Sequence, residues 1–218
     1  MKDKIDNLTW EPHIGKNYNK LGKEDRLLIV GESHYLAQND QGIEEANNSN
    51  FTQITIGNFG YNSKNRFFTN IRKIVLGQKA DNPSLLWDNC AFYNFIQRPM
   101  KDAKERPTKQ DFIEGWNVFF ELVKELQPSL VLFAGSTAAN VLHDNKSTLM
   151  SADRNFERVK WIYKIGRNYM KQVDFNFNGS ESLQVVCTLH PSKCPNTKSW
   201  HDYFIKQSKG KLNYLHNL

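Results

Sequence analysis

Two short motifs far apart in the chain carry side chains that could do acid–base chemistry. The first is Gly31-Glu32-Ser33-His34-Tyr35, and the second is His190-Pro191-Ser192. A carboxylate such as Glu32 can orient or deprotonate a water molecule. An imidazole such as His190 can stabilise the charge that develops on a leaving group. Together these residue types favour hydrolysis by a water molecule that the protein positions.

The first motif is also close to the nucleophile elbow G-x-S-x-G of serine hydrolases. In that interpretation Ser33 would attack the substrate and His190 would act as its base. Three observations count against it. Tyr35 stands where the elbow has its last glycine, Ala37–Gly42 is loop-like where a helix should begin, and few residues precede the serine to form earlier strands. A serine esterase-type hydrolase stays open as an alternative.

The spacing of potential ligands does not indicate a metal site. Glu32, His34 and His190 are scattered and lack an HExxH-type pattern, so we expect no metal. The three cysteines form no CxxC pair, which argues against a disulfide scaffold, a zinc ribbon and a four-cysteine iron–sulfur site. Their number fits a reducing, cytoplasmic compartment. The cysteines are Cys90, Cys187 and Cys194.

Four short apolar runs are expected to position these side chains. Each run is continuous rather than alternating, which is typical of strands that are buried on both faces of a parallel sheet. Ligands of such sheets bind outside the carboxyl ends of the strands. The side chains that this rule selects are Glu32, His34, Tyr35, Asn94 and His190. The runs are Arg26–Gly31, Cys90–Ile96, Leu130–Gly135 and Gln184–His190.

Helical patterns lie between the apolar runs. Strands that alternate with helices predict an α/β fold, a three-layer αβα sandwich around a central four-stranded, mainly parallel sheet. An additional hairpin is expected within Lys160–Phe177, turning at Gly166-Arg167-Asn168. The expected helices are Asn65–Leu76, Lys109–Gln127, a short helix capped by Ser136 or Thr137, and Ser199–Gln207.

The composition indicates one domain with a positive charge. The 218 residues include 29 Lys and Arg against 23 Asp and Glu, which gives a net charge of +6. This excess fits a polyanion such as nucleic acid, although a chain rich in Lys and Asn can reach it without selection for binding. No stretch approaches the roughly 20 apolar residues of a membrane span. The charged segment Met1–Trp10 does not read as a secretory signal.

Taken together, the motifs resemble those of the uracil-DNA glycosylase superfamily. In that family a motif GQDPYH or GEAPG follows the first strand, and HPS follows the fourth strand in several branches. The resemblance covers residues 25–205 and implies a single domain over residues 1–218. Three further segments agree with the family in order and spacing: Asn65-Arg66-Phe67-Phe68, Phe92–Pro99, and the stretch from Gln127-Pro128-Ser129 through Gly135 to Ala138-Ala139.

The resemblance implies a monofunctional DNA glycosylase that acts on uracil or a related base flipped out of DNA. Glu32 stands where the GEAPG branch has its water-activating Glu, so it would place water at C1′ and stabilise the cationic sugar. His190 would donate to the O2 oxygen of the leaving base. Asn94 would read the Watson–Crick edge, since an amide offers both a donor and an acceptor.

Further residues receive secondary roles from the same resemblance. Tyr35 would exclude the methyl group of thymine, and Ser33 stands where the GQDPYH branch has its catalytic Asp. Phe59 would stack under the base, with Tyr61 as the alternative. Residues expected at the DNA backbone are Ser136, Thr137, Ser192 and Lys193.

The sequence also departs from the family. His34 replaces a Pro that stiffens the first motif, and Gln97 replaces a cluster cysteine. We therefore expect no iron–sulfur cluster and no cofactor. The segment Lys193-Cys194-Pro195-Asn196 lacks the apolar wedge that some branches insert into DNA. A non-catalytic nucleic-acid-binding protein of the same fold is the alternative. The expected partner is single- or double-stranded DNA. We expect the protein to act as a monomer and not to bind a membrane.

Overall fold

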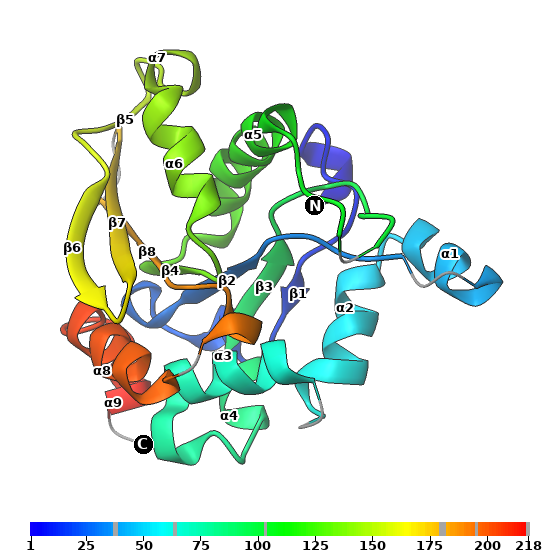
Figure 1. Cartoon of the computed structure of the whole chain (residues 1–218), viewed down its shortest axis with the longest axis horizontal. Coiled ribbons are helices and arrows are strands. Elements are labelled where there is room, and N and C mark those ends of the chain that lie inside the picture. Colours follow the sequence, from blue (N-terminus) through cyan, green and yellow to red (C-terminus); the bar gives the residue numbers. More distant parts are fainter. Residues whose placement is uncertain (37–38, 63–64, 103, 179–181, 195, 217–218) are drawn as a thin grey trace.

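The computed structural model describes residues 1–36, 39–62, 65–102, 104–178, 182–194 and 196–216. Within these residues, eight strands form one mixed sheet with helices packed against it (Figure 1). The strands are β1 (His13–Ile14), β2 (Leu27–Gly31), β3 (Cys90–Asn94), β4 (Leu130–Phe133), β5 (Arg154–Phe156), β6 (Lys160–Ile165), β7 (Asn168–Phe177) and β8 (Leu183–Cys187).

The sheet has the strand order β1-β3-β2-β4-β8-β7-β5, and β6 pairs with β7 outside this path. Strand β2 pairs in parallel with β3 and β4, and β4 pairs in parallel with β8. These are the four apolar runs. The α/β class is therefore confirmed, whereas the sheet is larger than the expected four strands. Strands β1, β5, β6 and β7 pair antiparallel, and β1 and β5 are too short to show a pattern in the sequence.

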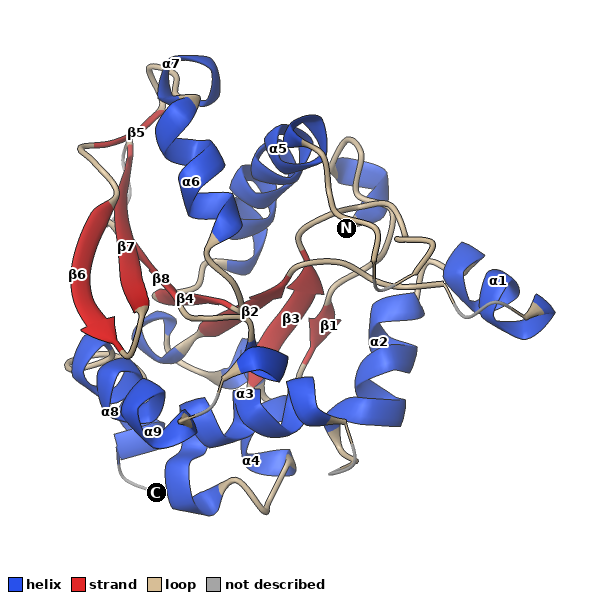
Figure 2. Ribbon diagram, viewed as in Figure 1, coloured by secondary structure: helices blue, strands red, loops and turns tan. Residues whose placement is uncertain are grey.

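Helices cover both faces of the sheet (Figure 2). The α-helices are α1 (Asp40–Asn47), α2 (Phe51–Thr55), α3 (Arg66–Leu76), α4 (Ser84–Trp87), α5 (Lys109–Leu126), α6 (Thr137–Asp144), α7 (Lys146–Leu149), α8 (Thr197–Gln207) and α9 (Asn213–His216). A π-helical turn follows α2 at Ile56–Gly60. Short 3₁₀ helices form at Lys2–Lys4, Tyr18–Lys20, Lys23–Asp25, Gly77–Lys79 and Pro191–Lys193.

Capping residues set the ends of the two expected long helices. The Asn65 side chain accepts hydrogen bonds from the first turn of α3. Thr108 and Asp111 form a reciprocal capping box at the start of α5. At the other end of α5, Gln127 takes a left-handed conformation with φ 51° directly before Pro128. Both helices therefore follow the sequence prediction.

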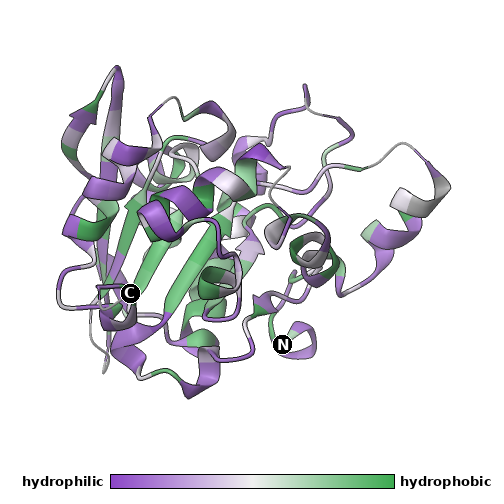
Figure 3. Cartoon of the chain, turned by 90° about the horizontal axis from the view of Figure 1, so that it is seen from below, coloured by the Kyte–Doolittle hydropathy of each residue, from purple (hydrophilic) through white to green (hydrophobic). Residues whose placement is uncertain are grey.

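Alternation along the strands divides the core into two halves. Leu28 and Val30 of β2 face α5, whose Trp116 belongs to the same apolar cluster. Leu27 and Ile29 face the opposite side, toward α3 and α8. Figure 3 shows the apolar strands enclosed by helices with polar outer surfaces. Burial on both faces explains why these strands read as continuous apolar runs.

Two segments near the ends of the sheet test the finer predictions. The hairpin of β6 and β7 is confirmed, with a turn at Gly166, where φ is 59°. The prediction of a loop over Ala37–Gly42 is wrong from Asp40 onward, where α1 begins. Asn39 caps this helix by accepting a hydrogen bond from the Gly42 amide. Ala37 lies outside the described residues. None of the helices in the described ranges is long and apolar enough to cross a membrane.

Candidate active site at the carboxyl edge of the sheet

The carboxyl ends of β2, β3, β4 and β8 lie at one edge of the sheet because these strands run parallel. Backbone hydrogen bonds continue the pairing into the loops that follow. The Ile96 amide donates to the Glu32 carbonyl at 2.9 Å, and the Thr188 amide donates to the Phe133 carbonyl at 2.9 Å. The first motif, Asn94, the loop after β4 and the second motif are thereby brought to the same edge.

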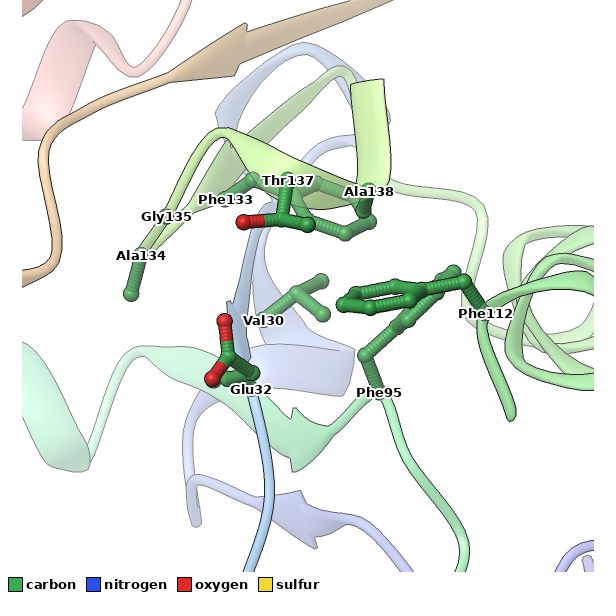
Figure 4. A pocket seen from close by; sticks show the side chains of 10 residues that line it. Val30, Glu32, Phe95, Phe112, Phe133, Ala134, Gly135, Thr137 and Ala138 are labelled. Atoms are coloured by element: carbon green, nitrogen blue, oxygen red, sulfur yellow. The ribbon is translucent and has the colours of Figure 1, made fainter. Parts of the chain in front are cut away.

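Glu32 is the first residue after β2 and lies partly buried in a small pocket (Figure 4). Its neighbours there include Phe95, Phe112 and Thr137. The pocket has a volume of about 10 Å³, which is room for about one water molecule. Within the described residues, the carboxylate accepts no hydrogen bond. It therefore has free lone pairs beside a space of water size.

Burial raises the pKa of the Glu32 carboxyl, because a charge is less well solvated in this pocket. The positive charges of Arg106 and Lys193 act in the opposite direction. Burial is the largest cause that lowers the pKa of His190, and the charges of Lys193 and Arg106 lower it further. The shared influence of the same two cations places Glu32 and His190 in one electrostatic environment.

Asn94 ends β3 directly opposite Gly31 in the parallel register. Its side chain is only 7% exposed, yet within the described part of the chain its amide makes no hydrogen bond. A Cβ atom added at Gly31 would lie 2.0 Å from Asn94 Oδ1. The amide thus lies across the backbone of Gly31, and this position requires a glycine. An amide that makes no hydrogen bond within the protein can bind a ligand through both its donor and its acceptor.

Gly31→Ala is expected to destabilise the fold by about 1–3 kcal/mol, because the new methyl group must displace the Asn94 amide or the backbone. Gly57→Ala is the matched control. A Cβ there meets no atom within 4 Å, and Gly57 lies in a helical turn. Urea unfolding measures both variants. Equal stability of the two would contradict the close approach of Asn94 to Gly31.

His190 follows β8 and is held by its own motif. The Ser192 hydroxyl forms a hydrogen bond of 2.7 Å with His190 Nδ1. When that hydroxyl donates, the proton of a neutral imidazole is carried on Nε2, which then serves as a donor. Because the pKa of His190 is lowered, the ring is neutral at neutral pH. The geometry supplies a neutral donor of fixed orientation.

Three residues that the sequence reasoning did not assign also contribute to this edge. The ring centroid of Phe67 lies 5.2 Å from that of His190. Asn70 donates a hydrogen bond of 2.7 Å to the Pro191 carbonyl and so fixes the turn of the second motif. Arg106, before α5, supplies charge. Phe67 and Asn70 are three residues apart in α3. This spacing is the signal in the sequence that could have identified both residues as neighbours of the site.

His34, which stands in place of the family's proline, is a core residue. Its ring is 4% exposed and packs 4.9 Å from Trp10 and 4.5 Å from Phe51. Nε2 shares a hydrogen bond of 3.3 Å with the Thr52 hydroxyl. Burial lowers the pKa of His34 to about 3. The histidine therefore fixes the first motif by packing, where a proline would fix it by backbone restriction.

The stability of the fold is expected to fall as the pH is lowered below 6.5. The unfolded chain protonates His34 near its ordinary pKa of 6.5, whereas the folded chain resists protonation down to about 3. Between these values each pH unit costs up to about 1.4 kcal/mol of unfolding free energy. His34→Phe should flatten this dependence, as measured by urea unfolding at several pH values. The exposed His143, changed to Gln, is the control, and an unchanged slope in His34→Phe would refute the assignment.

The nucleophile-elbow interpretation receives no geometric support. Ser33 Oγ is buried without a hydrogen-bond partner within the described residues. His190 Nδ1 is occupied by Ser192 instead. The next helix, α1, begins only at Asp40 rather than directly after the serine. Ser33 and His190 are therefore not arranged as nucleophile and base.

The aromatic residues assigned to the base pocket lie less centrally. Tyr35 is 41% exposed, and its backbone bridges to Met100. Phe59 is 45% exposed and stacks on Phe68 with ring centroids 6.4 Å apart. In the part of the chain that the structure describes, no ring contact or hydrogen bond joins Tyr35 or Phe59 to the three polar residues of the edge. The alternative, Tyr61, donates instead to Asp88 Oδ1 at 2.8 Å, before β3 begins.

Of the four residues assigned to the DNA backbone, Thr137 and Ser136 line two different pockets, whereas Ser192 and Lys193 line neither. Thr137 lines the Glu32 pocket, and Lys193 is exposed and close enough to influence the pKa of Glu32. Ser192 is engaged with the His190 ring. Ser136 lines a second pocket, where its carbonyl accepts a hydrogen bond of 3.3 Å from Lys171 Nζ.

The position where the resemblance would place a cluster cysteine has a structural role here. Gln97 accepts a hydrogen bond of 2.9 Å from the Thr9 amide and donates one of 2.6 Å to the Asn94 carbonyl. Within the described ranges, no group of three or more His, Cys, Asp or Glu side chains could hold a metal ion. The three cysteines are buried and unpaired.

No protein-family model matches the chain, and no curated protein matches its sequence. The functional argument therefore depends on the geometry of this edge and on the motifs.

Proposed function

We propose that the protein is a monofunctional DNA glycosylase, which hydrolyses the N-glycosidic bond of uracil or a related base and leaves an abasic site. The observation that carries the proposal is that three polar residues lie at or just after the carboxyl ends of three parallel strands, at the same edge of the sheet. Glu32 has a free carboxylate beside a water-sized space, Asn94 has an unpaired amide, and His190 is a neutral donor. Base release needs a group of each kind.

Each of the three groups supplies one part of the reaction. The Asn94 amide would hydrogen-bond the edge of a flipped base through both its donor and its acceptor. Glu32 would hold water against C1′ and stabilise the positive charge of the sugar as the bond breaks. His190 would donate through Nε2 to the oxygen on which negative charge builds.

The fold supports the proposal through the order of its elements. Strands β3, β2, β4 and β8 correspond to the four-stranded parallel core that the resemblance to the uracil-DNA glycosylase superfamily implies. The first motif follows the first of these strands in the sequence, and the second motif follows the last. The additional antiparallel strands lie outside this core. On this basis we propose a uracil-DNA glycosylase-like domain.

The distribution of charge also favours a polyanionic substrate. The charges of Arg106 and Lys193 influence the pKa of both Glu32 and His190, so positive charge lies near both residues. Phosphates of a bound strand would neutralise these cations and release counterions, which makes affinity fall with salt. By binding the phosphates, the same two cations would hold them apart from the Glu32 carboxylate.

The proposal is tested by incubating oligonucleotides that each contain one modified base and then treating them with alkali. The set should cover uracil, thymine analogues and deaminated purines in single and double strands. We expect strand breaks only after alkali, since an abasic site without a lyase step leaves the strand intact. Release of none of these bases, together with DNA binding, would favour the non-catalytic alternative. Ser33→Ala should retain activity, and its inactivity would favour the serine mechanism.

A further inference from the structure

The β6–β7 hairpin presents an aromatic surface beside the candidate active site. Figure 1 places this hairpin at the outer edge of the sheet. Trp161 is 62% exposed and Tyr169 is 49% exposed, although aromatic side chains are normally buried. Their ring centroids lie 6.0 Å apart with an interplanar angle of 36°. The two rings form an exposed aromatic pair on the hairpin.

Positive charge surrounds this aromatic pair. Lys171 Nζ lies 5.6 Å from the Trp161 ring centroid, and Lys164 Nζ lies 5.5 Å from that of Tyr169. Arg167 occupies the hairpin turn and lines the same pocket as the two rings. Within the described residues, none of the ion pairs involves these three cations, whereas the nearby Lys160 is paired with Asp174. Lys171 is only 7% exposed and donates hydrogen bonds to the Ser136 carbonyl and to Asn140 Oδ1. Lys164 and Arg167 are exposed and can meet an anion.

The two rings, Arg167 and Lys171 line a pocket of about 250 Å³, the larger of the two pockets described. It adjoins the candidate active site on two loops. Ser136 lines this pocket, and the next residue, Thr137, lines the pocket of Glu32. Leu189 also lines it and directly precedes His190. Consecutive residues of the loop after β4 therefore line the two pockets, and in the loop after β8 a residue of the hairpin pocket directly precedes His190. A DNA strand bound at the candidate active site could extend into the hairpin pocket.

We propose that the β6–β7 hairpin binds unpaired DNA, with a base stacked on Trp161 and Tyr169 and phosphates held by Lys164 and Arg167. Stacking on aromatic rings together with cations along the backbone is the usual mode of single-strand binding. Bases of a duplex are stacked on one another and cannot reach the rings. If the bound strand is the substrate of the candidate active site, this inference rests on the proposed function. Binding of unpaired DNA to the hairpin does not itself require catalysis.

Trp161 provides its own spectroscopic signal. The chain has five tryptophans, and the other four, Trp10, Trp87, Trp116 and Trp200, are at most 2% exposed. Titration with a short oligothymidylate, which contains no base to excise, should therefore quench the exposed part of the emission. Trp161→Phe should remove the quenching while keeping most of the affinity, because phenylalanine can still stack.

Affinity is measured by the fluorescence anisotropy of the labelled oligonucleotide. Trp161→Ala and Tyr169→Ala should each weaken binding about 5- to 150-fold, which corresponds to about 1–3 kcal/mol per stacked base. Tyr163→Ala is the matched control, because Tyr163 is also 62% exposed on β6 but lies outside the pocket. Lys164→Gln and Arg167→Gln should each reduce the slope of log affinity against log salt by about 0.7.

Three results would overturn the inference: no binding of oligothymidylate at low salt, equal affinity of Trp161→Ala and the unchanged protein, or equally tight binding of a duplex that also depends on Trp161. The outcome is separable from that of the proposed function. If no base is released but oligothymidylate binds and quenches Trp161, the hairpin site stands and the glycosylase proposal fails. If bases are released and Trp161→Ala changes neither affinity nor KM, the glycosylase proposal stands and the hairpin site fails.

Discussion

Glu32→Gln is expected to slow base release by about 10²–10⁴-fold while leaving DNA affinity nearly unchanged. Glutamine has almost the same shape, so it can enter the same pocket, but it can neither deprotonate water nor stabilise a cationic sugar. Single-turnover base release and equilibrium binding to the same oligonucleotide separate the two effects. Equal loss of binding and of rate would show that Glu32 contributes to affinity rather than to chemistry.

The same substitution should leave the fold as stable as before or more so at neutral pH. Burial raises the pKa of Glu32 in the folded chain above its ordinary value of 4.5. The unfolded chain therefore loses this proton at lower pH, and folded stability falls as the pH rises through that window. Glutamine carries no charge and avoids this cost. A lower melting temperature of Glu32→Gln at pH 7 would contradict the assignment of Glu32 as a carboxylate held for function.

The pH profile of the unchanged protein follows from the same shift. Glu32 acts as a carboxylate, so the rate should rise with pH as it loses its proton, with a midpoint above 4.5. Burial and the nearby cations lower the pKa of His190 below its ordinary value of 6.5, so its ring is mainly neutral at pH 7.

The second large effect is expected for His190→Ala, which should reduce the rate of base release by about 10²–10³-fold. The imidazole stabilises negative charge that exists only as the glycosidic bond breaks, so the loss should appear in kcat more than in KM. It should also be smaller for 5-fluorouracil than for uracil, because the fluorine already stabilises the departing anion. The same loss for both bases would exclude His190 as the donor to the leaving group.

Ser192→Ala is the matched control for His190. It retains the imidazole but removes the hydrogen bond of 2.7 Å to Nδ1, which orients the ring. We expect a smaller loss of rate than in His190→Ala, with the dependence on the leaving base retained. A loss as large as that of His190→Ala would indicate that Ser192 itself takes part in the chemistry.

The sequence was sufficient to predict the elements whose signals are local. Burial on both faces gives four strands continuous apolar runs, which can be recognised in the sequence. These strands are β2, β3, β4 and β8. Helices α3 and α5 show periodic apolar residues with polar caps at Asn65 and Thr108. The rule that ligands bind at carboxyl strand ends then selected Glu32, Asn94 and His190. It also selected Tyr35 and His34, and the latter is a core residue. Helix α1 was missed because its signal is a cap at Asn39 and not an apolar stripe.

The remaining features depend on contacts between distant segments. Phe67 reads as a core residue in α3, and its approach to His190 is decided by how that helix packs against the loop after β8. The burial of His34 depends on Trp10 and Phe51 from two other segments. The contact of Lys171 with Trp161 depends on the register of the hairpin. No pattern within a single segment could have shown these contacts.

The measurement that tests the central claim most directly is detection of the free base after incubation with a uracil-containing single-stranded oligonucleotide. The unchanged protein and Glu32→Gln should be compared at the same concentrations. The account predicts free uracil and an alkali-sensitive strand with the unchanged protein, and bound but intact oligonucleotide with Glu32→Gln. Equal release by both proteins would contradict the role of Glu32. Absence of any released base across the full set of modified oligonucleotides would contradict the glycosylase function.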